Sequence, residues 1–112
     1  MSKYHNKKTM IDNITFDSIR ESQRYLELKI LLKAGKIKDL KLQHVYELQA
    51  AFTDNQGKKH RPITYIADFV YDDLENPVFR IVEDVKGIRT EAYKLKKKLF
   101  LHKYKNVCFF EI

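Results

Sequence analysis

One short run of residues decides the fold of this chain: Ile81-Val82-Glu83-Asp84-Val85-Lys86-Gly87. It begins as an apolar strand, then carries two carboxylates and a lysine, and stops at a glycine. Side chains alternate between the two faces of a strand, so Asp84 and Lys86 share one face with Val82, and Glu83 points to the other. A carboxylate and an ammonium group on one face of a rigid strand can together bind a metal ion and contact a water molecule beside it.

A first helix is predicted before the strands, over residues 18–33. Ser18 and Glu21 have the spacing of a capping box, which satisfies the first backbone N–H groups of a helix. An apolar stripe with helical spacing follows: Tyr25, Leu28 and Leu32. Ala34-Gly35 is a natural helix end, since glycine adopts the left-handed conformation needed there.

Three strand candidates follow the helix: residues 40–52, 64–71 and 78–86. The first is expected to be bent or interrupted and to end at a chain reversal, residues 54–57. Short links favour an antiparallel meander. A second helix over residues 90–102 and a last strand over 107–112 imply a right-handed crossover to a parallel neighbour. The expected fold is α/β, in the order αβββαβ, with a mixed central sheet flanked by helices.

Length and composition describe one small folded domain. The chain has 112 residues, 44% of them apolar, with three Gly and two Pro, which suits a single core. We expect residues 14–112 to form this domain and residues 1–13 to be a flexible basic arm. No window resembles a membrane span or a secretory signal, so we expect no membrane partner and a cytoplasmic location. The single cysteine, Cys108, is typical of that reducing compartment.

The positive charge of the chain is concentrated in one segment. The formal net charge is +7, and residues 86–105 hold eight basic residues against the single acid Glu91. The rest of the chain therefore sums to zero. A basic block directly after the charged strand is the electrostatic footprint expected for a polyanion, with nucleic acid as the first candidate. A solvated helix face is the plainer interpretation.

A second acid lies on the preceding strand. Asp68 is embedded among apolar and aromatic residues, next to the strand that carries Asp84. A buried carboxylate is costly unless it has a partner or a metal. If register and facing agree, the two acids lie near each other, and a divalent cation would relieve their repulsion. Mg²⁺ suits such a site, because it takes a few carboxylates and keeps waters for reaction.

This order of elements and acids resembles the PD-(D/E)XK nuclease superfamily. That superfamily has an αβββαβ core, an acid on the second strand, and the sequence acid, any residue, lysine on the third. Asp68 takes the first place and Asp84-Val85-Lys86 the second, while Glu21 matches an acid that several branches carry on the first helix. Ala67 stands where the motif has proline, and Asp84 stands where glutamate is commoner.

Several strings carry a closer resemblance, which covers almost the whole chain from Phe16. They are Phe16-Asp17-Ser18, Glu21, Arg24-Tyr25, Tyr65-Ile66-Ala67-Asp68-Phe69, Val82-Glu83-Asp84-Val85-Lys86-Gly87, Thr90 and Tyr93-Lys94-Leu95-Lys96. They are similar to a small family encoded by phages and prophages of Gram-positive bacteria. That family is considered similar to phage and archaeal Holliday junction resolvases and to transposase endonuclease subunits.

The resemblance implies metal-assisted hydrolysis of phosphodiester bonds in DNA, within the cytoplasm of the bacterial host and with no organic cofactor. Asp68, Asp84 and the main-chain carbonyl of Val85 would bind Mg²⁺, or Mn²⁺ in its place. Glu21 would be a direct or water-mediated ligand. Lys86 would orient the attacking water or stabilise the charged transition state.

The resemblance also implies how DNA is held. The residues expected to contact the DNA are Arg89, Thr90, Lys94, Lys96 and Lys97. Contacts to phosphates fix the register of a protein on DNA without reading bases. Gln43 lies near the site in the family pattern. Resolving a Holliday junction takes two symmetric cuts, so that substrate implies a homodimer.

Plainer interpretations stay open at this point. The acid and the lysine at the strand end could form only a surface salt bridge, and Glu21 could only cap its helix. Asp68 could pair with Arg61 or Arg80. The chain would then be a nucleic-acid-binding accessory protein that keeps the fold without cleaving, or an interaction module. The sequence does not distinguish DNA from RNA.

Overall fold

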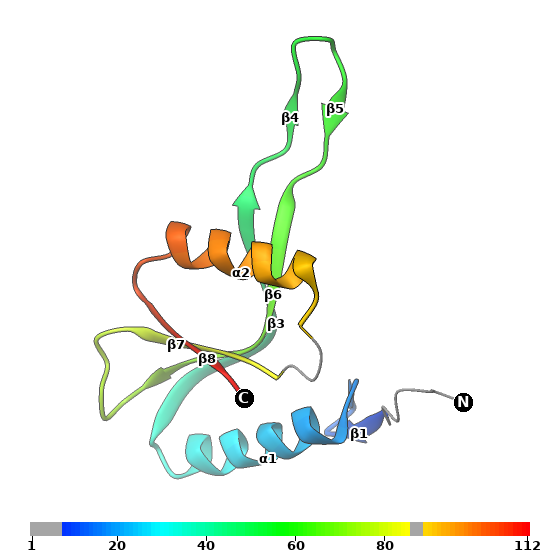
Figure 1. The fold of residues 1–112 in the computed structure, drawn as a ribbon. Helices are drawn as coiled ribbons and strands as arrows, with labels where there is room; N and C mark the ends of the chain where they lie inside the picture. The colour runs from blue at the N-terminus through cyan, green and yellow to red at the C-terminus, as the bar shows by residue number, and fades with distance from the viewer. Residues whose placement is uncertain (1–7, 86–88) are drawn as a thin grey trace.

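The computed structural model describes residues 8–85 and 89–112 and shows a mixed α/β fold (Figure 1). Its two helices are α1 (Ile19–Lys33) and α2 (Glu91–Lys103). Its main sheet contains, in spatial order, β3 (Ile37–Gln49), β6 (Ile63–Asp73), β7 (Arg80–Asp84) and β8 (Val107–Glu111). The pairs β3–β6 and β6–β7 are antiparallel, and β7–β8 is parallel. The predicted element order, meander and parallel last strand are confirmed.

A short hairpin precedes α1, made of β1 (Thr9–Ile11) and β2 (Ile14–Phe16). Asp12 and Asn13 form its two-residue turn, with φ values of 53° and 62°. Asp and Asn tolerate this left-handed conformation better than other side chains, and such a turn matches the twist of a hairpin. The prediction of a flexible arm over residues 1–13 is therefore wrong for Thr9–Ile11.

Both ends of α1 are built as the sequence predicts. Ser18 is the N-cap, and its Oγ accepts a hydrogen bond of 3.1 Å from the Glu21 N–H. At the other end Gly35 has a φ of +74°, and its N–H donates to the Leu32 carbonyl at 3.1 Å. The next N–H, of Lys36, donates to the carbonyl of Leu31 at 2.9 Å. This is a Schellman motif, which satisfies the last carbonyls of the helix.

The core is divided between the two faces of the sheet, with one helix on each face (Figure 1). The cluster beneath α2 contains Tyr46, Tyr65, Ala67, Val70, Val82, Tyr93 and Phe100. The cluster beneath α1 contains Phe16, Tyr25, Leu28, Ile37, Phe69 and Tyr71. Adjacent residues of β7 therefore serve different layers, since Val82 belongs to the α2 side and Ile81 packs on the α1 side.

The two long strands change faces in their middle. On β3, Leu42 packs on the α1 side but Tyr46, four residues later, packs on the α2 side. Regular alternation would keep both on one face. The change occurs at Gln43, whose φ is 50°, which is uncommon for a residue other than glycine. On β6 the same change separates Ala67 from Phe69. The predicted bend in the first long strand is thus confirmed.

The third predicted strand is shorter than residues 78–86. β7 begins at Arg80, and Val78 and Phe79 lie in the turn before it, largely exposed. Arg80 is the first residue in register with both neighbours, opposite Asp72 of β6 and Val107 of β8. At the other end the strand stops at Asp84, and Lys86 lies outside the described residues.

Candidate functional site

Asp68, in the middle of β6, and Asp84, the last residue of β7, lie where the pairing of these two adjacent strands ends. The β6–β7 ladder ends at the pair Phe69 and Glu83, and the two aspartates are the next residue on each strand. Asp84 is fully buried and Asp68 is 8% exposed. Both acids are thus buried beside the end of the β6–β7 ladder, and their sharing of one cation stays a prediction.

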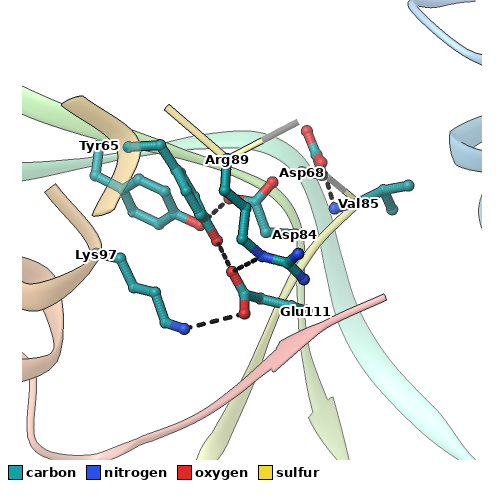
Figure 2. Close-up of polar contacts among 8 residues, drawn as sticks. Tyr65, Asp68, Asp84, Val85, Arg89, Lys97 and Glu111 are labelled. Carbon is teal, nitrogen blue, oxygen red and sulfur yellow. Dashed lines mark hydrogen bonds and ion pairs between the residues drawn. The ribbon is translucent and has the colours of Figure 1, made fainter. Parts of the chain in front are cut away.

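Asp68 is held by two donors, one from β3 and one from the residue after β7, and Figure 2 shows the second of these contacts. Its Oδ2 accepts a hydrogen bond of 2.8 Å from the backbone N–H of Val85, and its Oδ1 accepts one of 3.2 Å from Nε2 of Gln43. The carboxylate of Asp68 thus lies against the peptide that follows Asp84. Its donors come from two strands that flank β6, and one of them is the residue where β3 changes faces.

Asp84 lies on the side of the sheet that α2 covers. Its Oδ2 accepts a short hydrogen bond from the hydroxyl of Tyr65, which lies on β6 in the cluster beneath α2. Burial, and next the hydrogen bond to Asp84, raise the pKa of Tyr65 far above its usual value. Tyr65 therefore stays a neutral donor over the whole physiological range. This buried hydrogen bond fixes the direction of the Asp84 carboxyl group.

A further acid, Glu111, lies beside Asp84 and was missed by the sequence reasoning. The parallel register places Glu111 of β8 directly opposite Asp84. Its carboxylate accepts hydrogen bonds from the Tyr93 hydroxyl at 2.6 Å, Lys97 Nζ at 3.0 Å and Arg89 Nε at 3.2 Å. These contacts, the one from Tyr93 foremost, lower the pKa of Glu111 to about 2. Figure 2 shows the two cations converging on it.

The basic residues predicted to contact DNA do not all lie on one side of α2. Lys94 and Lys97 line one cavity, of about 380 Å³, which Arg89 and Glu111 also line. Lys96 lines another, of about 290 Å³, together with Thr90. Thr90 is also the N-cap of α2, because its Oγ1 accepts a hydrogen bond from the N–H of Tyr93. The predicted set is therefore split between two hollows that flank α2.

Glu83 faces α1, opposite to Asp84, as strand alternation predicts. Arg24 of α1 donates to both of its oxygens, from Nε at 2.7 Å and from Nη2 at 2.6 Å, and the Tyr71 hydroxyl donates to Oε2. The hydrogen bond to Glu83 raises the pKa of Arg24 further above its usual range. Glu83 is only 2% exposed, so it anchors α1 to the sheet through a buried ion pair.

Glu21 lies in the first turn of α1, three residues before Arg24 and on the same side of the helix. It is 6% exposed. Among the residues that the structure describes, no three His, Cys, Asp or Glu side chains form a group that could hold a metal ion. The metal-binding role of Glu21 therefore stays a prediction. The strand register pairs Asp84 with Glu111, and Asp68 lies one residue beyond the Phe69–Glu83 pair.

Neither Arg61 nor Arg80 forms the ion pair with Asp68 that the sequence left open, among the contacts of the described residues. Arg80 donates to Asp72 at 2.9 Å and to the carbonyl of Asp39 at 3.0 Å. Within residues 8–85 and 89–112, Arg61 forms no ion pair within 4 Å. The plain interpretation of Asp68 as an arginine partner is not supported.

Comparison with known protein families identifies the chain. A family model described as "Protein of unknown function (DUF1064)" matches residues 1–111, so the chain belongs to this family. No curated protein and no solved structure matches the chain significantly. In the described part of the chain, neither helix is long and apolar enough to cross a membrane.

Proposed function

We propose that this member of the DUF1064 family is a metal-dependent endonuclease that hydrolyses phosphodiester bonds in DNA. One observation carries the proposal: two buried carboxylates, Asp68 and Asp84, directly follow the last pair of the β6–β7 ladder on adjacent antiparallel strands. A four-stranded mixed sheet with a helix on each face agrees with the PD-(D/E)XK resemblance. The finer assignment, a restriction-endonuclease-like core, is part of the same proposal.

The donor set suits Mg²⁺ or Mn²⁺. Proteins usually hold Mg²⁺ with one or two carboxylates, while waters and substrate phosphates complete its six positions. A carboxylate has about four lone-pair sites, so the hydrogen bonds that orient Asp68 do not prevent it from binding a cation. The carbonyl of Val85, and Glu21 through a water, are the further oxygen ligands that we propose.

The surrounding residues position the two acids. Gln43 and the N–H of Val85 orient Asp68, and Tyr65 orients Asp84. Such outer partners fix the direction of metal ligands and tune their basicity. When bound, the metal would lower the pKa of a coordinated water and offset charge that develops on the phosphate.

Positive charge beside the acids supports a polyanionic substrate. Arg89 and Lys97 lie at Glu111, which is in register with Asp84. Cations at this place would meet the phosphates next to the scissile bond and hold the backbone in register. Lys86 is proposed to orient the attacking water, from its place in the sequence motif.

Within DNA, we propose branched or recombining molecules as the substrate, on the resemblance to Holliday junction resolvases. Two symmetric cuts in a four-way junction would require two copies of this chain. The substrate panel is therefore linear duplex, single strand, flap and four-way junction, with RNA versions beside them. Mass measurement of the protein with and without the junction tests the dimer.

The decisive experiment compares amide variants of the two acids. Asp68→Asn and Asp84→Asn keep the shape of the side chain but remove its charge. The matched control is Asp73→Asn, at the far end of the same strand as Asp68. We expect cleavage by the parent with Mg²⁺ or Mn²⁺ and none with EDTA, a loss of at least about 100-fold in both site variants, and parental activity in the control. Site variants that cut as fast as the parent, or a parent that cuts nothing, would refute the proposal.

A second candidate is a nucleic-acid-binding protein that does not cleave. The absence of a three-residue metal-binding group among the described residues favours it. This candidate predicts that the parent binds DNA but leaves every substrate intact with either metal. It also predicts that neutralising Lys94, Lys96 and Lys97 abolishes binding.

A further inference from the structure

A hairpin projects from the main sheet, away from both helices (Figure 1). It consists of β4 (Phe52–Thr53) and β5 (Lys59–His60), and it continues the two long strands β3 and β6. The radius of gyration is 16.3 Å, above the roughly 13 Å typical of a compact domain of about 100 residues. Neither core cluster includes a residue of β4 or β5, so the hairpin lies outside the packed core.

The hairpin is held together by its own residues. Asp54 Oδ1 accepts hydrogen bonds from the N–H groups of Gln56 at 2.9 Å and Lys58 at 3.0 Å, and its Oδ2 lies 2.8 Å from Nε2 of His60. The ring of Phe52 stacks on that of His60, with centroids 4.6 Å apart. An isolated hairpin is marginally stable at best, so these contacts give the tip a defined shape without support from the body.

The tip carries uncompensated positive charge. Lys58, Lys59 and Arg61 are exposed. Residues 54–61 contain a single acidic residue, Asp54. Within residues 8–85 and 89–112, none of these three cations forms an ion pair within 4 Å. An ordered arm with three exposed cations is complementary in charge to a phosphate backbone.

The same strands carry the arm and the candidate site. Arg61 precedes Asp68 by seven residues, which is about 23 Å along a strand and about seven base pairs of duplex DNA. On the face away from α2, this interval is lined by the register pair Val45 and Ile66, which are 55% and 47% exposed. This face is therefore exposed along the ribbon between Asp68 and the arm, and Glu47 is an exposed acidic residue on the same stretch of β3.

We propose that the β4–β5 hairpin is a second DNA-binding arm, in which Lys58, Lys59 and Arg61 contact phosphates about seven base pairs from the candidate site. This inference rests on the proposed action on DNA. The contacts are to the phosphate backbone of the DNA, so they raise affinity and fix the position of the protein on DNA of any sequence. They also set a minimum length of duplex that the protein can hold at both places.

The test is binding of duplexes of different length, measured by fluorescence anisotropy in EDTA so that no strand is cut. The arm variant is Lys58→Ala, Lys59→Ala and Arg61→Ala together. The matched control removes the same charge at the other end of the molecule: Lys29→Ala, Lys33→Ala and Lys38→Ala, all exposed. Circular dichroism checks that both variants fold as the parent does.

For the parent we expect duplexes of 20 base pairs to bind at least tenfold more tightly than duplexes of 6. The arm variant should lose this length preference, and its salt dependence should fall by roughly one unit of slope per contact removed. The control should keep both. If the parent binds DNA and the arm variant keeps its slope and length preference, the arm is refuted while the proposed function stands. If the parent binds no DNA, both are refuted.

Discussion

Replacing Arg24 with methionine tests how α1 is fixed to the sheet. Arg24 supplies two of the hydrogen bonds to Glu83, and the Tyr71 hydroxyl supplies another. The side chain of Glu83 is 2% exposed, whereas that of Arg24 is 23% exposed. In the variant, the carboxylate would lose its cation and have almost no access to water. The fold would then contain a buried charge with only a neutral donor.

The expected cost follows from this difference in exposure. Removing one partner of a buried ion pair costs about 3–5 kcal/mol, because the other charge stays buried. Since Arg24 reaches solvent in part, we expect the lower value, about 3 kcal/mol. Glu83→Gln should cost less, about 1–2 kcal/mol, because Arg24 can turn toward water and keeps Glu27 at 2.9 Å. Both losses are large beside the 5–15 kcal/mol typical of a whole domain.

Urea unfolding at constant m-value measures these losses. The double variant Arg24→Met with Glu83→Leu, which removes both charges, should lie within about 2 kcal/mol of the parent. Equal losses in the two single variants, or a loss below about 1 kcal/mol for Arg24→Met, would refute the view that Glu83 is an anchor without access to water.

Other variants test the site directly. Tyr65→Phe removes the donor to Asp84 and should cost about 1–2 kcal/mol in urea unfolding and slow cleavage with unchanged DNA affinity; unchanged cleavage would contradict the positioning role. The folded pKa of Glu111 is about 2, below its usual 4.5, so its stabilising contribution is complete above about pH 4.5 and is lost as the pH falls toward 2. Unfolding midpoints between pH 2 and 5 should fall less steeply in Glu111→Gln, and parallel curves would exclude this contribution. Gln43→Gly relieves the left-handed strain at this position but also removes the amide that binds Asp68, so the two effects on stability should nearly cancel, to within about 1 kcal/mol. Cleavage should slow, because Asp68 loses a positioning contact. A variant that does not fold would contradict this expectation.

Local signals in the sequence predicted most of the architecture. The spacing of Ser18 and Glu21, and a glycine at position 35, locate the ends of α1 because capping depends on neighbouring residues alone. The crossover through α2 follows from the length of the link between β7 and β8. These features need no knowledge of distant contacts, so a single sequence carries them.

The rest depends on contacts between distant segments. Glu111 looks like an ordinary strand residue until the parallel register sets it opposite Asp84. The sequence contained one usable signal, an acid at the carboxyl end of the strand after the crossover. Arg24 and Glu83 are 59 residues apart, and no local pattern predicts their pairing. Gln43 adopts a left-handed conformation that its residue type does not signal, since glutamine is not among the residues enriched there.

The position of the acids follows from where the sheet narrows. β7 and β8 end at Asp84 and Glu111, while β3 and β6 continue beyond them as a two-stranded ribbon. At that point the backbone of Gln43 reverses which face the following side chains take. Beyond it, one face of the ribbon packs beneath α2 and the other is exposed to solvent. Asp68 lies at this change, where it can reach the end of β7. The chain thus places Asp68 between a packed core and an open face, and under the proposed function this is where an extended substrate would reach the buried carboxylates.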